Sequence, residues 1–127
     1  MKNERMFLKC SICGNIVGIV EDAGPTLVCC GQEMKQLMPN TMDAALEKHV
    51  PVAERKGGEI EVHIGSVPHP ATEEHHISWV VLAGESNTQR ATLGHTAEPR
   101  VSFCVNSDES VSVYAYCNLH GLWASEV

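Results

Sequence analysis

The residues best suited to chemistry in this 127-residue chain are its six cysteines and seven histidines. Four of the cysteines, Cys10, Cys13, Cys29 and Cys30, form a C-x2-C pair followed by an adjacent pair. The first pair, followed by Gly14, is typical of a knuckle whose turn lets two thiolates face one metal. Four thiolates suit a tetrahedral zinc or iron site. Since four merely hydrophobic cysteines would have to converge by chance, the spacing predicts a metal site.

The adjacent pair bears on the choice between zinc and iron, because both metals accept four thiolates. Neighbouring residues cannot form the C-x2-C knuckle. We therefore expect the sulfurs of Cys29 and Cys30 to approach the metal from a more extended backbone and to distort the tetrahedron. This arrangement resembles desulforedoxin, a small iron protein, more than a common zinc ribbon.

A second group of potential ligands lies further along the chain: His49, His69, His75 and His76, and the Cys117-Asn118-Leu119-His120 loop. Imidazole and thiolate bind transition metals, and a C-x2-H loop can bring both groups to one ion. Each of these residues is weak evidence alone, because a single histidine is more often a surface or hydrogen-bonded residue.

The elements that must position these residues differ between two parts of the chain. Residues 1–37 have one short β-like run, Asn15 to Val20, which ends at the turn sequence Asp22-Ala23-Gly24-Pro25. Because this unit has too few apolar residues to build an independent core, we expect a metal to stabilise it.

Residues 38–127 are predicted to form a second domain. Met38 to Lys56 is interpreted as a connector bracketed by Pro39 and Pro51, with helical character only over Met42 to Leu46. The predicted strands that follow are Glu59 to Val67, Ile77 to Ala83, Thr88 to Leu93, Arg100 to Val105 and Ser110 to Cys117. Gly57-Gly58 indicates a hairpin turn, and the spacing of the strands favours a small antiparallel β-sandwich.

Composition narrows the classes of function. The formal net charge is -7, and the excess of acid lies beyond Leu37, which argues against nucleic acid or an anionic membrane as the main partner. No apolar run approaches the roughly 20 residues of a membrane span. Met1 to Lys9 lacks the pattern of a secretory signal, so we expect a cytoplasmic protein whose cysteines stay reduced.

Taken together, these motifs resemble a known family. Glu47 to Pro51, His69-Pro70 with His75 after five intervening residues, and Cys117 to Gly121 resemble superoxide reductase. The four-cysteine cluster resembles the two-iron desulfoferrodoxin subtype, and the resemblance covers essentially the whole chain. It implies a desulforedoxin-like unit followed by an immunoglobulin-like sandwich, a homodimer, and a rubredoxin-like electron donor. The implied reaction is one-electron reduction of superoxide to hydrogen peroxide without release of O2.

The resemblance also implies a role for individual residues. His49, His69, His75 and His120 would be equatorial ligands and Cys117 the axial thiolate of one iron, while the four-cysteine cluster would hold another. Glu47 would occupy the open position in the ferric state, and Lys48 would supply positive charge beside it. The chain departs from the family pattern at Ala71, where a methionine is expected, and at His76, where an aromatic residue is common. His76 could therefore compete with His75.

Other residues are predicted to be structural. His63 is expected on the exposed face of its strand, His95 in a turn, Trp79 in the core and Trp123 against the metal loop. Cys104 is expected opposite Val101 and Phe103 as a structural thiol. Two alternatives to the enzyme are a zinc-containing module that binds a partner protein and a simple electron carrier that uses only the first iron. That iron could relay electrons or act as a structural staple.

Overall fold

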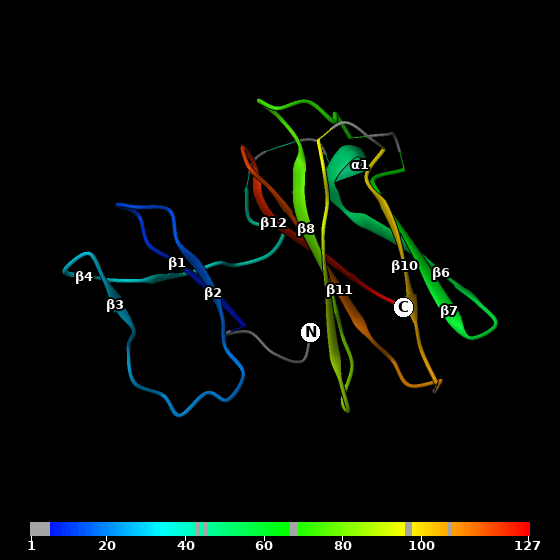
Figure 1. Cartoon of the computed structure of the whole chain (residues 1–127), viewed down its shortest axis with the longest axis horizontal. Helices are drawn as coiled ribbons and strands as arrows, with labels where there is room; N and C mark the ends of the chain where they lie inside the picture. The colour runs from blue at the N-terminus through cyan, green and yellow to red at the C-terminus, as the bar shows by residue number, and fades with distance from the viewer. Residues whose placement is uncertain (1–5, 43, 45, 67–68, 96–97, 107) are drawn as a thin grey trace. The chain divides into compact units, whose positions relative to one another are not determined.

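The structure is a computed structural model that describes residues 6–127 except 43, 45, 67–68, 96–97 and 107, and it leaves the Glu47 side chain undescribed. The chain divides into two compact units, Met1–Met38 and Pro39–Val127. Both are built mainly from antiparallel strands, which confirms the mainly β fold class (Figure 1).

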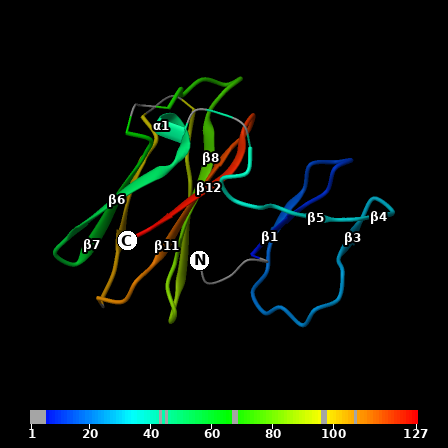
Figure 2. The same cartoon turned by 180° about the vertical axis from the view of Figure 1, so that it is seen from behind.

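The first unit has little regular structure. Its strands are β1 (Phe7–Lys9), β2 (Ile16–Gly18), β3 (Val28–Cys29), β4 (Gln32–Glu33) and β5 (Lys35–Gln36). They form a three-stranded sheet in the order β2-β1-β5 and a separate β3-β4 hairpin. Figure 2 labels β1, β3, β4 and β5 of this unit. The buried hydrophobic residues among its described positions are Met6, Phe7, Leu8 and Cys10. So small a core agrees with the expectation that a metal contributes to stability.

The second unit is a β-sandwich. One sheet has the order β10-β7-β6 and the other β12-β11-β8-β9. The strands are β6 (Pro51–Lys56), β7 (Glu59–Ile64), β8 (Ile77–Ala83), β9 (Thr88–Thr92), β10 (Arg100–Cys104), β11 (Ser112–Cys117) and β12 (Gly121–Glu126). Apolar side chains of β7, β8, β10 and β11 form one buried core between the sheets. Within the described residues, the sandwich has seven strands like the constant-type immunoglobulin sandwich, but its fourth strand, β9, joins the sheet of β8, β11 and β12 rather than that of β6, β7 and β10.

The prediction of a connector over residues 38–56 is wrong from Pro51 onward, where a strand begins. The described helix of this segment is α1 (Leu46–His49), which shares only Leu46 with the predicted Met42 to Leu46, and residues 43 and 45 of that prediction lie outside the described residues. Pro51–Lys56 is a strand that pairs with β7. Pro51 is tolerated because it is the first residue of an edge strand, where a missing N–H disrupts little of the ladder. Gly57 (φ 63°) lies in the tight turn between β6 and β7, which confirms the predicted hairpin.

A β-bulge at the end of β11 orients the residues beside the second ligand group. Tyr116 pairs with Trp79, but Cys117 pairs with Ile77, so Ser78 is the extra residue. On β8 the buried core residues are Val80 and Leu82, and the bulge returns Ile77 to that same core. Cys117 therefore lies in the core at the end of β11, where the chain turns into the loop that carries His120.

None of the described helical residues forms a segment that is long and apolar enough to cross a membrane.

Candidate metal centres

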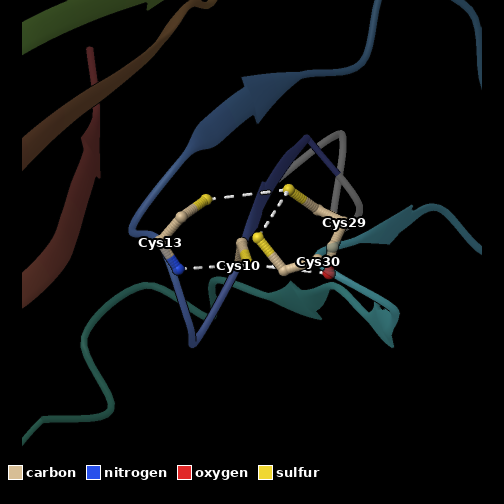
Figure 3. A group of neighbouring side chains, drawn as sticks. All are labelled: Cys10, Cys13, Cys29 and Cys30. Atoms are coloured by element: carbon tan, nitrogen blue, oxygen red, sulfur yellow. Dashed lines mark hydrogen bonds between the residues drawn. The ribbon is translucent and has the colours of Figure 1, made fainter.

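The first candidate centre is the four-cysteine cluster of the small unit. Cys10 follows β1 directly, and the turn after it is closed by two main-chain bonds: the Gly14 N–H donates to Cys10 O at 3.1 Å and the Cys10 N–H donates to Asn15 O at 2.8 Å. Gly14 has φ 84°, in the left-handed region that favours glycine. This turn is the predicted knuckle, and it directs Cys13 toward the other cysteines (Figure 3).

The adjacent pair is held by a hairpin turn. Cys29 is the last residue of β3, and Cys30 (φ 53°) and Gly31 (φ 74°) make a two-residue turn into β4. Two successive positive φ values are typical of a type I′ turn, which matches the twist of paired strands. The expectation of a more extended backbone is therefore wrong at Cys30, because the left-handed turn brings its sulfur back beside that of Cys29.

The sulfur spacing fits a metal ion. The Sγ atoms of Cys13 and Cys29 lie 3.7 Å apart, those of Cys29 and Cys30 lie 4.0 Å apart, and all four lie within 4.8 Å of one another. A tetrahedron with metal–sulfur bonds of about 2.3 Å has sulfur–sulfur edges of roughly 3.8 Å.

Three of these thiols differ in pKa. The main-chain N–H groups of Cys13 and Ile12 point at the Cys10 sulfur and lower the Cys10 pKa to about 6. Hydrogen bonds with Cys13 and Cys10 raise the Cys30 pKa to about 12, and a bond with Cys13 raises the Cys29 pKa. A metal that binds here must therefore displace protons from the later-ionising thiols.

The second candidate centre lies at one end of the sandwich. Ligand atoms of His49, His69, His75 and Cys117 lie within 4.8 Å of one another, and His75 alone of the four is half-buried rather than buried. His120 joins them, because its Nδ1 lies 3.1 Å from His49 Nε2 and 3.9 Å from Cys117 Sγ. The structure thus brings together all five residues of the predicted second site.

The four imidazoles are arranged as the corners of a square. Ring centroids of successive neighbours are 4.7 Å apart for His49 and His69, 4.6 Å for His69 and His75, 5.0 Å for His75 and His120, and 4.9 Å for His120 and His49. Neighbouring planes meet at 74° to 86°. The His49 and His75 rings, across the diagonal, are 6.3 Å apart and inclined by only 30°. Such a square suits four equatorial ligands around one ion.

Two buried nitrogen atoms indicate that the site is built for an ion. The His69 Nδ1 lies 2.7 Å from Pro70 O, so Nδ1 is the protonated nitrogen that donates and Nε2 keeps a free electron pair. In the described part of the chain, Nε2 of His69 and Nε2 of His75 are buried without a hydrogen-bond partner. Such buried polar atoms are rare and need an explanation, which a metal at the centre of the square provides.

Burial favours the neutral form of two of these imidazoles, which is the form that binds a metal. It lowers the His69 pKa to about 4 and also lowers the His75 pKa. Burial raises the pKa of the Cys117 thiol, while main-chain N–H groups of Leu119 and His120 lower it. The His69 and His75 imidazoles are therefore neutral near pH 7, and the two N–H groups favour the thiolate that a metal would bind.

The remaining predicted residues lie outside this cluster. His76 is directed elsewhere: its Nδ1 lies 2.9 Å from Thr72 O and 3.1 Å from Glu73 O, so the geometry favours His75 over His76. His95 lies in a bend, as predicted. Cys104 lies on β10 on the face opposite Val101 and Phe103, as predicted, and is exposed. Lys48 is exposed, and its charge contributes to the lowered pKa of His75.

Two expectations about burial are wrong. His63 is half-buried, because it bends back toward Gly65, with Nδ1 3.2 Å from the Gly65 carbonyl oxygen. Trp79 is only half-buried, because Val80 and Leu82 occupy the core face of β8 and leave Trp79 on the outer face, stacked on Tyr116. The role predicted for the Glu47 side chain lies outside the described residues.

Fold and sites together define a class of protein: a mainly β metalloprotein with a four-thiolate site in a small unit and a histidine–thiolate site in a sandwich. Comparison with known proteins agrees. The family model described as "Desulfoferrodoxin" matches residues 41–126, and that of the "Desulfoferrodoxin, N-terminal domain" matches residues 2–37. The chain belongs to the desulfoferrodoxin family.

Individual relatives cover nearly the whole chain. A desulfoferrodoxin homolog of Archaeoglobus fulgidus is 48% identical over 92% of this chain and 93% of its own length. A desulfoferrodoxin of Nitratidesulfovibrio vulgaris is 41% identical over 99% of both chains. The crystal structure of the superoxide reductase from Treponema pallidum, 37% identical, superimposes with a TM-score of 0.76 over 93% of this chain and 98% of its own.

Proposed function

We propose that this protein is a superoxide reductase. One superoxide, one electron and two protons give one hydrogen peroxide, and no O2 is formed. The observation that carries this function is the square of four imidazoles closed by Cys117 in a protein of the desulfoferrodoxin family. A structural zinc site needs only four ligands in a closed tetrahedron, whereas a square of imidazoles with one thiolate suits a redox metal with an open position.

In this proposal His49, His69, His75, His120 and Cys117 would hold the iron. Support comes from the near-perpendicular neighbouring rings and from the two buried Nε2 atoms that lack partners among the described residues. His120 binds through Nδ1, the atom that faces both His49 and Cys117. When bound, iron supplies the one-electron chemistry, which a thiolate ligand tunes by pushing electron density onto the metal.

The chain's own contribution is to hold these ligands, attract the anionic substrate and limit access. Lys48 is exposed at the end of α1, next to His49, and its positive charge reaches His75. Because the chain as a whole carries a net charge of -7, local positive charge must guide superoxide to the site. Glu47 precedes Lys48, and we propose that its carboxylate acts at the open face in the oxidised state.

The four-cysteine cluster is proposed to hold a second iron. Its support is the four-thiolate geometry and the family match to residues 2–37. We propose a structural role for this iron, because the unit around it has so small a core. Residues 1–37 and 38–127 would then be distinct domains, one stabilised by its metal and the other catalytic.

The reaction also needs an external electron donor, for which we propose a rubredoxin-like carrier. We further propose a homodimer in the cytoplasm, where six free cysteines would remain reduced.

The deciding experiment measures products. Protein purified anaerobically and reduced is mixed with a known amount of superoxide, and peroxide and O2 are quantified. A reductase yields one peroxide for each superoxide consumed and no O2. Peroxide at half that yield together with O2 would indicate dismutation, and no reaction by an iron-loaded protein would leave only a metal-binding module.

A further inference from the structure

The turn that carries His75 is held in place by a residue that has no ligand role of its own. We propose that Asn118 is a positioning residue for the second metal site. Its side-chain amide forms hydrogen bonds with the peptide groups on both sides of His75 and links them to the end of β11. The inference rests on the proposed function in one respect, that His75 binds the iron.

Asn118 makes three hydrogen bonds to this turn. Its Nδ2 donates to the Glu74 carbonyl oxygen at 2.9 Å, and its Oδ1 accepts from the His76 N–H at 2.9 Å. Its own main-chain N–H donates to His76 O at 3.2 Å. The planar amide thus satisfies one acceptor before His75 and one donor after it.

His75 needs such support because it does not lie in a strand. Its turn is closed locally by Thr72, whose Oγ1 accepts from the His75 N–H at 3.1 Å and whose N–H donates to His75 O at 3.0 Å. These bonds shape the turn but do not fix it to the sandwich. The bonds from Asn118 do, because they join residues that are 42 and 44 positions apart in the chain.

The same contact links His75 to the thiolate. Asn118 directly follows Cys117, which the β-bulge places opposite Ile77. Asn118 therefore extends the β11–β8 ladder one step beyond its last pair, from Ile77 to His76. Because this short segment positions Cys117, His75 and His120, a displacement of the Asn118 amide would move the His75 ring relative to the Cys117 sulfur.

Asparagine suits this position chemically. The site requires one donor and one acceptor in a single short planar group. Aspartate would keep the acceptor for His76 but would place a carboxylate oxygen against the Glu74 carbonyl oxygen. Alanine would leave both main-chain groups without this partner.

The test compares Asn118→Ala and Asn118→Asp with a matched control, Gln89→Ala. The Gln89 side-chain amide also bonds main chain, donating to Cys104 O at 2.8 Å, but Gln89 pairs with Leu82, toward the end of β8 that lies away from His76. Affinity of the second site for Fe²⁺ is measured anaerobically by competition with a chelator. The thiolate-to-iron absorption band and the electron paramagnetic resonance spectrum of the oxidised site are recorded in parallel.

Asn118→Ala is expected to weaken Fe²⁺ binding at the second site about 10- to 100-fold and to alter its spectra, with the first site unchanged. Gln89→Ala should change neither quantity. Asn118→Asp is the sharper variant, because added negative charge alone would strengthen cation binding, whereas misplacement of His75 would weaken it.

The failure of this inference is distinguishable from failure of the proposed function. Wild-type affinity and spectra in both Asn118 variants, while wild-type protein binds iron and reduces superoxide, would overturn the positioning role alone. Should Asn118→Ala not fold, Asn118→Asp decides, and stronger Fe²⁺ binding by that variant would also overturn it. Wild-type protein that binds iron without reducing superoxide would instead remove the enzymatic function and leave the Asn118 result standing.

Discussion

Trp123 supports two histidines of the second site at once. Its indole stacks on the His49 ring at a centroid distance of 5.0 Å and an interplanar angle of 26°. Its Nε1 donates to the His120 carbonyl oxygen at 3.0 Å. These contacts confirm the predicted packing of Trp123 on the metal loop. The fully buried indole supports the side of the imidazole square that is formed by His49 and His120.

Replacement of Trp123 by phenylalanine should keep the stacking and remove the hydrogen bond. We expect a loss of about 1–2 kcal/mol in the free energy of unfolding and a shifted spectrum of the second site. Trp123→Ala should cost about 3–5 kcal/mol because it also leaves a cavity. Denaturant unfolding and visible spectroscopy measure these effects. Trp79→Phe, on the outer face of the same sheet, is the control that should leave the spectrum unchanged. An unaltered spectrum in Trp123→Phe would contradict the supporting role.

Metal identity should be visible in the colour of the oxidised protein. Thiolate-to-iron charge transfer is expected to give bands from two distinct ferric sites, whereas zinc has a filled d shell and gives none. Metal analysis and a visible spectrum after native, anaerobic purification test this. A colourless protein that contains only zinc would overturn both iron assignments.

The two sites should be separable by mutation. Cys13→Ser is expected to abolish the four-thiolate spectrum while rapid superoxide reduction remains, because the first iron is proposed to be structural. His49→Ala or Cys117→Ser should disrupt the reactive centre. Cys104→Ser serves as the control, since Cys104 belongs to neither cluster. Loss of superoxide reduction in folded Cys13→Ser protein with its second site loaded would make the first iron an obligatory relay.

Lys48 should govern the encounter with superoxide. Lys48→Ile is expected to leave the iron spectrum intact, to slow the second-order reaction of the reduced protein severalfold and to weaken its dependence on ionic strength. The matched control is Lys56→Ile, which changes the net charge equally but removes a lysine already paired with Glu54 and Glu61 at 3.9 Å and 3.3 Å. Pulse radiolysis across a salt series measures both rates. Equal effects of the two substitutions would assign the role to net charge.

Acid should destabilise the metal-free protein in a defined range. Burial lowers the His69 pKa from 6.5 to about 4, so between those values the unfolded chain binds a proton that the folded chain does not. The stability present above pH 6.5 should therefore fall as the pH approaches 4, by about 3 kcal/mol for this group. Denaturant titrations of metal-free protein across this range measure the loss, and His69→Gln should flatten the dependence. A stability that is constant from pH 6.5 to 4 in the wild type would contradict the buried, neutral imidazole.

The local part of the first centre was predictable from sequence. The C-x2-C spacing with Gly14 predicts the knuckle because a few consecutive residues determine such a turn. The β3–β4 turn was missed because Cys30 adopts a positive φ, which is uncommon for a residue other than glycine.

The sequence by itself determined the chemistry of this protein: the types of ligand, their order, and the alternating strands that form the sandwich. Only the tertiary structure decided which ligands meet. It selects His75 over His76, directs Nδ1 of His120 toward the cluster, and brings Asn118 against the turn around His75. These outcomes depend on the pairing register of β11 with β8 and on a one-residue bulge, and a shift of one residue moves a side chain to the other face. Spacing along the chain carries no direct information about that register, because it is set by packing between strands that are distant in sequence.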